Sequence, residues 1–316
     1  MDSVIGLDVG GTVMKAAITA ADGTVLYTDR RPTPREQGAD TVIAALVEFA
    51  ADLTYAATDR HLTPRALGVA VPGIIDEAGG VAVFSANLGW RDAPLRKLVA
   101  ERTALPVAIG HDVRAGGLAE SRVGAGRGSR QFVFLPIGTG IASAIVLDGR
   151  TLSGAHGGAG EVGHLVVRPG GQPCPCGSAG CLEVYASGAS IARRYAERHG
   201  PGSDLTAAEI AARVVAGDAA ACEVWSEAID ALADALAQVT ILLDPGLVVI
   251  GGGVGDAGET LLAPLRTALA SRLTFSQAPR LVRAELGDAA GSLGAALLGW
   301  DLLDDAARSD SDRSQS

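Results

Sequence analysis

The stretch Val4-Ile-Gly-Leu-Asp8-Val-Gly10-Gly11-Thr12-Val-Met-Lys15-Ala-Ala-Ile18 carries the pattern on which the fold depends. An apolar run closes at Asp8, two glycines and a threonine follow, and an alternating apolar pattern resumes at Val13. This order predicts two antiparallel strands joined by a glycine turn, which together make a β-hairpin.

The turn of this hairpin has the composition of a phosphate-binding loop. Glycines without a Cβ let backbone N–H groups approach phosphate oxygens closely, and the hydroxyl of Thr12 adds a donor. Asp8, at the end of the first strand, is placed to hold a water molecule bound to Mg²⁺. The alternative is an ordinary Gly-Gly turn that binds no ligand.

A second copy of the pattern lies further along the chain. We expect strands at Phe132–Ile137 and Ile141–Leu147, joined by the turn Gly138-Thr139-Gly140. This internal duplication of a glycine-tipped hairpin favours two lobes that hold a phosphate chain between them. Neither copy has the spacing of a P-loop or of the dinucleotide-binding fingerprint, so both of those interpretations are excluded.

Strands and helices alternate over the rest of the chain, which predicts an α/β protein with mixed sheets. Further buried strands are expected at residues 67–71, 107–109 and 247–250. Apolar residues at helical spacing predict helices at residues 39–57, 95–103, 112–123, 219–243, 259–270 and 288–301. Residues 304–316 are polar and charged, and we expect a loose tail there.

Composition narrows the class of protein. A chain of 316 residues with 48% hydrophobic residues can bury a large core, which excludes a disordered protein. The net charge of −10 argues against a nucleic-acid partner. No apolar run reaches the length of a membrane span and the N-terminus lacks the pattern of a signal peptide. We therefore expect no membrane partner and a cytoplasmic location.

The segment from His164 to Glu183 brings together one imidazole and three thiols, those of Cys174, Cys176 and Cys181. Structural zinc takes four such ligands in a tetrahedron, often from close pairs joined by short turns. Redox thiols, a disulfide and core cysteines are the alternatives. Clustered cysteines in a chain without an export signal more often bind metal, so we favour a zinc ion that braces a loop carrying carboxylates.

Three further positions suit substrate binding or catalysis. Asp244–Val254 places three glycines between a strand and a helix, which suits a nucleotide, although a plain β–α turn is the alternative. Asp112 follows a strand and opens a helix, so it can serve as a general base or simply cap the helix. Asn87 offers a donor and an acceptor to a polyol.

Taken in order, these motifs resemble those of the ROK family (repressor, open reading frame, kinase) from Ser3 to about Trp300. The matching motifs are D-x-G-G-T, N-L-x-W, an Asp before a helix, G-T-G, A-G-E-x-G-H, C-x-C-G-x-x-G-C-x-E and D-P-x₅-G-G-G. The resemblance implies the duplicated actin-like ATPase (ribonuclease H-like) α/β fold, with two lobes and a cleft between them. It implies a smaller lobe of residues 1–112 with helix 288–302 packed on it, a larger lobe of residues 113–287, and a disordered tail at 303–316.

The resemblance also implies a role for each site residue, with Asp112 as the base for a sugar 6-hydroxyl. The sugar would be bound by Asn87, His111, Asp112, Glu161, His164 and Glu183. Phosphates and nucleotide would be bound by Asp8, Gly10, Gly11, Thr12, Lys15, Gly138, Thr139, Gly140, Gly251, Gly252 and Gly253. Structural Zn²⁺ would be bound by His164, Cys174, Cys176 and Cys181, with the second nitrogen of His164 facing the sugar.

The implied activity is the ATP- and Mg²⁺-dependent phosphorylation of a hexose at its 6-hydroxyl, with glucose as the first substrate. N-acetylglucosamine or N-acetylmannosamine is the alternative substrate, and a non-catalytic sugar sensor or repressor is the more distant alternative. The resemblance suggests a homodimer or homotetramer. Two departures from the family pattern stand out. His111 stands where the family usually has Asn, which bears on affinity or specificity for the sugar, and Val13 stands where the family often has Lys.

Overall fold

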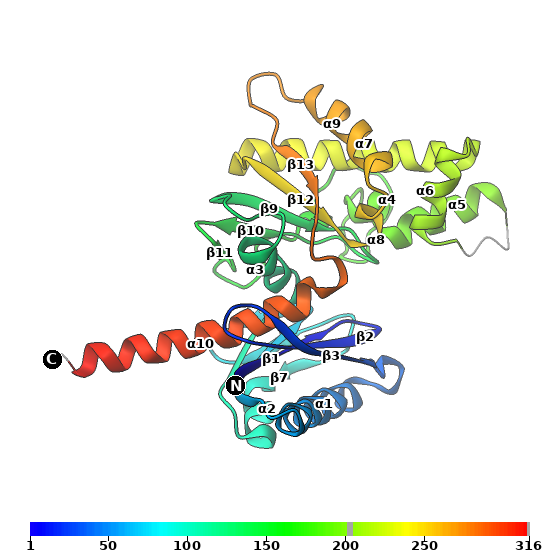
Figure 1. Cartoon of the computed structure of the whole chain (residues 1–316). Helices are drawn as coiled ribbons and strands as arrows, with labels where there is room; N and C mark the ends of the chain where they lie inside the picture. The colour runs from blue at the N-terminus through cyan, green and yellow to red at the C-terminus, as the bar shows by residue number, and fades with distance from the viewer. Residues whose placement is uncertain (201–204, 315–316) are drawn as a thin grey trace. The chain divides into compact units, whose positions relative to one another are not determined.

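The computed structural model describes residues 1–200 and 205–314, which form two compact units (Figure 1). The first unit contains residues 1–123, 153–159 and 288 onwards, and the second contains residues 124–152 and 160–287. The boundary that we expected after residue 112 therefore lies at Val123. The reason is that α3 (Asp112–Val123) packs against α10 (Ala290–Ser314), which belongs to the first unit.

The first unit is built on a five-stranded sheet with the order β3-β2-β1-β4-β8. Its strands are β1 (Asp2–Val9), β2 (Val13–Thr19), β3 (Val25–Pro32), β4 (Thr63–Val71) and β8 (Val107–His111). Strand β2 runs antiparallel to both β1 and β3, whereas β4 runs parallel to β1, and β8 runs parallel to β4. The predicted hairpin is confirmed as β1 and β2.

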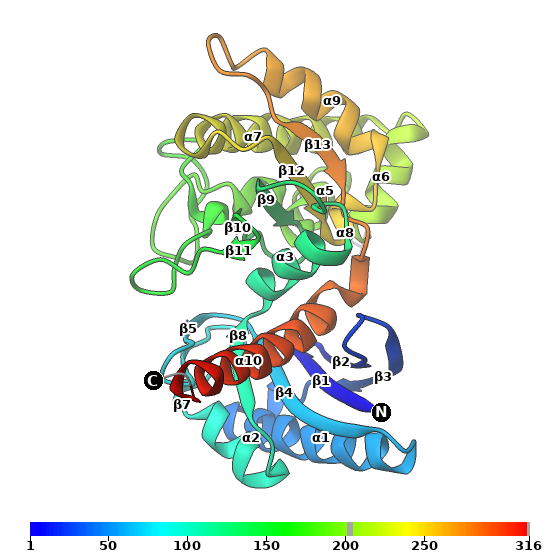
Figure 2. The same cartoon turned by 60° about the vertical axis from the view of Figure 1, so that its left-hand side comes forward.

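Helices cover both faces of this sheet. In Figures 1 and 2, α1 (Ala39–Asp59) and α2 (Leu95–Thr103) lie on one face and α10 lies on the other. Gly6 of β1 and Gly68 of β4 lie directly under α10, where any Cβ would collide with the helix backbone. A small second sheet completes the unit, formed by β5 (Ile74–Asp76), β6 (Val81–Phe84) and β7 (Arg91–Ala93).

In the described part of the chain, α1 is the one helix that is long and apolar enough, by length and composition alone, to cross a membrane. Its residues Val42, Leu46 and Phe49 are fully buried in the core of the first unit. Core helices meet the same test, so α1 does not indicate a membrane span.

The second unit repeats the sheet of the first, with the order β11-β10-β9-β12-β13. Its strands are β9 (Gln131–Pro136), β10 (Ala144–Leu147), β11 (Arg150–Thr151), β12 (Leu247–Gly251) and β13 (Arg280–Arg283). Again three strands form an antiparallel meander and two more run parallel to the first of them. The duplication predicted from the two glycine turns is therefore present in the sheets.

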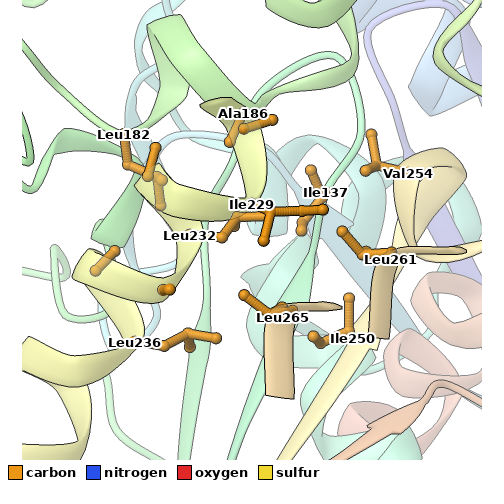
Figure 3. Packing of buried hydrophobic residues seen from close by; sticks show 14 of the residues in the cluster. Ile137, Leu182, Ala186, Ile229, Leu232, Leu236, Ile250, Val254, Leu261 and Leu265 are labelled. Carbon is orange, nitrogen blue, oxygen red and sulfur yellow. The ribbon is translucent and has the colours of Figure 1, made fainter. Parts of the chain in front are cut away.

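The helices of the second unit pack around its longest member. They are α4 (Glu183–Ala186), α5 (Gly188–His199), α6 (Ala207–Val215), α7 (Ala219–Leu243), α8 (Gly252–Gly255) and α9 (Glu259–Ala270). Figure 3 shows side chains of α7 and α9 meeting Ile250 of β12 in the core. A capping box opens α6, in which the side chains of Thr206 and Glu209 each bond to the other's backbone N–H.

Two segments differ from the sequence expectation. Strand β10 begins at Ala144 rather than Ile141, and only an isolated bridge between Ile137 and Ile141 precedes it. Helix α10 continues to Ser314, so residues 303–314, expected as a loose tail, are helical. Apolar spacing predicts the part of a helix that packs against a core, and it carries no signal for helical turns beyond that part.

Candidate active site and metal centre

The first glycine turn is held by its own sheet. The N–H of Gly10 donates to the carbonyl of Val13 at 3.1 Å. Thr33, directly after β3, donates its hydroxyl to the carbonyl of Gly10 at 2.7 Å and its N–H to that of Thr12 at 2.8 Å. Apart from the adjacent residues, no atom of the described residues lies within 4 Å of the position that a Cβ of Gly11 would take. The tip is thus fixed in shape and open to a ligand.

Asp8 is placed opposite Lys15 in the register of the hairpin. Burial raises the pKa of Asp8 to about 7, with a smaller contribution from the negative charge of Asp112. The ammonium group of Lys15 is bound by Asp288, at 2.5 Å between Nζ and Oδ1, and Arg30 contacts the same carboxylate at 3.1 Å. The sequence did not reveal Asp288 as a partner of Lys15.

Asp112 is the first residue of α3 and follows β8. Its Oδ1 accepts a hydrogen bond from the N–H of Val113 at 2.7 Å, and 27% of its side chain is exposed. The structure therefore gives Asp112 a fixed orientation at the helix start while leaving the carboxylate accessible. Neighbouring His111 is buried, and its Nδ1 lies 3.3 Å from Oδ1 of Asp112 without a well-aligned hydrogen bond to any described residue.

The N-L-x-W motif separates into one exposed and one buried residue. Asn87 is exposed in the turn between β6 and β7, where it is free to meet a ligand. Trp90 is only 2% exposed and belongs to the core of the first unit.

Arg114 was not singled out from the sequence, yet it organises part of the first unit. Its Nε and Nη2 contact Oε1 of Glu77 at 3.1 and 2.9 Å, and its Nη1 donates to the carbonyl of Gly157 at 3.0 Å. The side chain of Arg114 is buried, whereas that of Glu77 is 41% exposed. Arg114 thereby attaches residues 153–159 to the first unit. An Arg beside the small residues Ala115, Gly116 and Gly117 of α3 was the available signal.

The second glycine turn is held by residues that follow the cysteine segment. The carbonyl of Gly138 accepts from the N–H of Gly188, at the start of α5, at 2.7 Å. The N–H of Ile141 donates to Oε2 of Glu183, at the start of α4, at 2.8 Å. The expected sugar ligand Glu183 is thus also a support of the turn.

The three glycines at the junction of β12 and α8 lie beside the same turn. The N–H of Ile137, just before the turn, donates to the carbonyl of Gly251 at 2.9 Å, and the N–H of Val254 donates back to the carbonyl of Ile137 at 3.0 Å. The structure therefore brings the expected phosphate turn and the expected nucleotide segment, Gly251, Gly252 and Gly253, together in one unit.

Glu161 and His164 are the two ends of one short segment that contains the 3₁₀ turn Val162–His164. Ser143 fixes its start by donating its N–H and hydroxyl to the carbonyl of Gly160, at 2.7 and 3.0 Å. Gly160 has φ +96°, which favours glycine at that position. Both Glu161 and His164 are exposed, so their side chains are free to contact a ligand.

The ligand atoms of His164, Cys174, Cys176 and Cys181 all lie within 4.8 Å of one another. The distance is 3.7 Å from Nδ1 of His164 to Sγ of Cys174, and also 3.7 Å from Sγ of Cys176 to Sγ of Cys181. A tetrahedral ion with metal–sulfur bonds of about 2.3 Å has edges of about 3.8 Å. The cluster therefore has the size of a tetrahedral metal site.

Burial and the two neighbouring thiols raise the pKa of Cys181 to about 12. The backbone N–H of Ser178 and the Cys174 thiol lower the pKa of the exposed Cys176. Three sulfurs so close together need a positive charge to become thiolates, and a bound cation supplies it. The donor set therefore fits a divalent metal ion with a preference for sulfur and imidazole.

Comparison with known proteins identifies the family to which this chain belongs. A model of the ROK family matches residues 4–301. The chain belongs to the ROK family. The glucokinase of Thermotoga maritima is 35% identical over 308 residues, which cover 93% of this chain and 96% of that protein.

Two solved structures extend the comparison. A ROK hexokinase from Thermus thermophilus is 37% identical with a TM-score of 0.83, covering 96% of this chain and 99% of that one. A ROK glucokinase from Streptomyces griseus, in complex with glucose and AMPPNP, is 30% identical with a TM-score of 0.81, covering 95% of this chain and 99% of that one.

A sequence relative is named for a different sugar. The N-acetyl-D-glucosamine kinase of Pectobacterium atrosepticum is 33% identical over 305 residues, covering 93% of this chain and 97% of that protein.

These relatives agree on the reaction class while differing in the sugar. The chain is a sugar kinase, that is, a phosphotransferase with an alcohol group as acceptor. Its duplicated sheets are those of the actin-like fold of this family.

Proposed function

We propose that the chain transfers the terminal phosphoryl group of ATP to the 6-hydroxyl of a hexose, with glucose as the preferred substrate. The observation that supports this most strongly is the placement of Asp112. Its carboxylate is oriented by the N–H of Val113 and stays partly exposed, close enough to Asp8 for the two charges to interact. A general base thus lies in the same unit as the first glycine turn.

Asp112 acts on the sugar hydroxyl. As the 6-oxygen attacks phosphorus, the carboxylate accepts the hydroxyl proton, so that no alkoxide has to form free in solution. The bond from Val113 holds one oxygen in place, which fixes the direction in which the carboxylate receives the proton.

Phosphoryl transfer depends mainly on positioning and on neutralisation of charge. We assign positioning to the backbone N–H groups of Gly10, Gly11, Thr12 and of Gly138, Thr139, Gly140, with Gly251, Gly252 and Gly253 beside the nucleoside. Bound Mg²⁺ supplies the remaining neutralisation of the phosphates. Asp8 is suited to hold a water of that ion, because a nearby cation favours its ionised form over the protonated form that burial favours. Lys15, bound by Asp288, adds a positive charge at the turn.

The sugar is bound by Asn87, His111, Glu161, His164 and Glu183, by analogy with the family pattern. We propose a structural Zn²⁺ at His164, Cys174, Cys176 and Cys181. His164 directs its Nδ1 toward the sulfurs, which leaves its Nε2 for a sugar hydroxyl. We also propose a cytoplasmic enzyme that acts as a homodimer or homotetramer.

N-acetylglucosamine is the second candidate substrate, because a kinase named for it is nearly as similar to this chain as the glucokinases are. N-acetylmannosamine is considered with it, since the same acidic and imidazole ligands are expected to serve both sugars.

The test is the initial rate of ADP release from ATP and Mg²⁺ with glucose, mannose, fructose, N-acetylglucosamine and N-acetylmannosamine. We expect glucose to exceed the others in kcat/KM. An N-acetylated sugar in first place would replace glucose and keep the reaction. No sugar-dependent release, from folded protein that contains zinc, would contradict the proposed activity.

A further inference from the structure

The second glycine turn is supported at both ends by the segment that follows the last cysteine. Glu183 lies two residues after Cys181, and its Oε2 accepts a hydrogen bond from the N–H of Ile141 at 2.8 Å. Gly188, five residues further, donates to the carbonyl of Gly138 at 2.7 Å. Of these two supports, only the one from Glu183 comes from a side chain.

The carboxylate of Glu183 lies directly on the turn. A Cβ built on Gly140 would be 2.6 Å from Oε2 of Glu183, which is closer than any real Cβ contact. The φ angle of Gly140 is not positive, so its backbone does not require glycine. The absence of a side chain at this position serves the approach of the carboxylate.

The backbone that carries Glu183 is itself fixed by the cysteine segment. The N–H of Leu182 donates to the carbonyl of Leu165 at 2.9 Å, and the backbone of Cys181 forms an isolated antiparallel β-bridge with that of Val166. Both Cys181 and Leu182 are fully buried. Glu183 therefore projects from a rigid segment, and its position relative to the turn follows from how that segment folds.

We propose that Glu183 is a positioning residue for the nucleotide turn, in addition to its proposed contact with the sugar. This inference rests on the proposed phosphate-binding role of Gly138, Thr139 and Gly140. One carboxylate oxygen orders the turn through Ile141 before any ligand arrives. Its second oxygen remains for a sugar hydroxyl, so one side chain serves both substrates.

A positioning residue and a residue that only binds sugar differ in their effect on nucleotide affinity. A pure sugar ligand affects the KM for sugar and leaves nucleotide affinity unchanged when sugar is absent. A positioning residue changes nucleotide affinity even without sugar. Glu183→Gln retains an oxygen that accepts from Ile141, whereas Glu183→Ala retains none.

The experiment measures the Kd of AMPPNP with Mg²⁺ by calorimetry, in the absence of sugar. A hydrogen bond to a charged group contributes enough that we expect Glu183→Ala to weaken binding about tenfold or more. Glu183→Gln should stay within about threefold of the unchanged protein, since the acceptor is kept. Glu161→Ala is the matched control: it removes another proposed sugar ligand, and it should leave this Kd unchanged.

A double-mutant cycle tests the same contact from the other side. Gly140→Ala should weaken AMPPNP binding because the new methyl group displaces the carboxylate. In Glu183→Ala/Gly140→Ala the methyl group has room, so the double variant should bind no more weakly than Glu183→Ala alone. Fully additive losses would overturn the proposal.

Zinc content and melting temperature of every variant show that each is folded. If the unchanged protein binds no AMPPNP, the proposed function fails. If it binds AMPPNP and Glu183→Ala binds equally well, the proposed function stands and this inference fails.

Discussion

The two glycine turns arise from the same sequence pattern and are held in different ways. The first is fixed by Thr33, which directly follows β3 of its own sheet. The second is fixed by Glu183 and Gly188, which follow the Cys₃His cluster. The repeated sequence pattern therefore produces the same pair of strands in both units. The residues that hold each turn differ, because the first turn is held by its own sheet and the second by the segment that follows the cysteines.

The largest effect is expected from Asp112→Asn, which removes the general base and leaves the hydrogen bonds that hold both turns unchanged. Asn still accepts the N–H of Val113 but cannot take up the hydroxyl proton, so kcat should fall by about 10²–10⁴-fold. Steady-state kinetics and calorimetry measure kcat and the affinities for sugar and AMPPNP. We expect both affinities to remain. Turnover within a few-fold of the unchanged protein would remove Asp112 as the base.

Cys176→Ala should affect the second turn and spare the first. Loss of one ligand should release the metal, loosen the segment that carries Glu183, and lower both activity and AMPPNP affinity. Metal analysis and calorimetry measure the two losses together. Cys222→Ala is the control, because Cys222 lies outside the cluster. A zinc-free Cys176→Ala protein with full activity would show that the turn does not need the metal.

Thr33→Val is the counterpart of Glu183→Ala in the first unit, with a smaller expected effect. It removes the hydroxyl bond to Gly10 and keeps the backbone bond to Thr12, so AMPPNP binding should weaken only a few-fold. Zinc content should not change. Thr58→Val, which removes a similar hydroxyl bond on α1, controls for the loss of a hydroxyl. Zinc loss in Thr33→Val would contradict independent anchoring.

The smallest effect concerns stability and pH. The pKa of Asp8 rises from 3.8 to about 7 on folding, so the folded protein binds the proton more tightly. Stability should therefore fall as pH rises between these values and level off above them. Asp8→Asn should remove this fall, giving a higher melting temperature than the unchanged protein at pH 8 and a similar one near pH 4. The second turn has Pro136 at the equivalent position and contributes no such dependence.

Thermal melts between pH 4 and pH 8 without added Mg²⁺ measure this difference. Adding Mg²⁺ and AMPPNP should stabilise the unchanged protein more than Asp8→Asn at pH 8. Parallel pH profiles for the two proteins would show that Asp8 is not the titrating group.

Local patterns in the sequence predicted much of the molecule. Strand β1, the 25-residue helix α7 and the spacing of the Cys₃His cluster all depend on neighbours along the chain, which periodicity and spacing record. The first unit extends to Val123 because α3 packs on α10, more than 160 residues later, and no local pattern contains that contact. The contacts of Arg114 with Glu77 and Gly157, and the hydrogen bond from Ile141 to Glu183, were not predicted for the same reason.

The proposed reaction transfers a phosphoryl group from ATP to the 6-hydroxyl of a hexose. Phosphorus NMR of the protein with ATP, Mg²⁺ and glucose tests it most directly, because it observes both products. We predict that ADP and a sugar 6-phosphate appear in equal amounts and at equal rates. ADP that appears with free phosphate and no phosphorylated sugar, or a spectrum that does not change, would contradict the account.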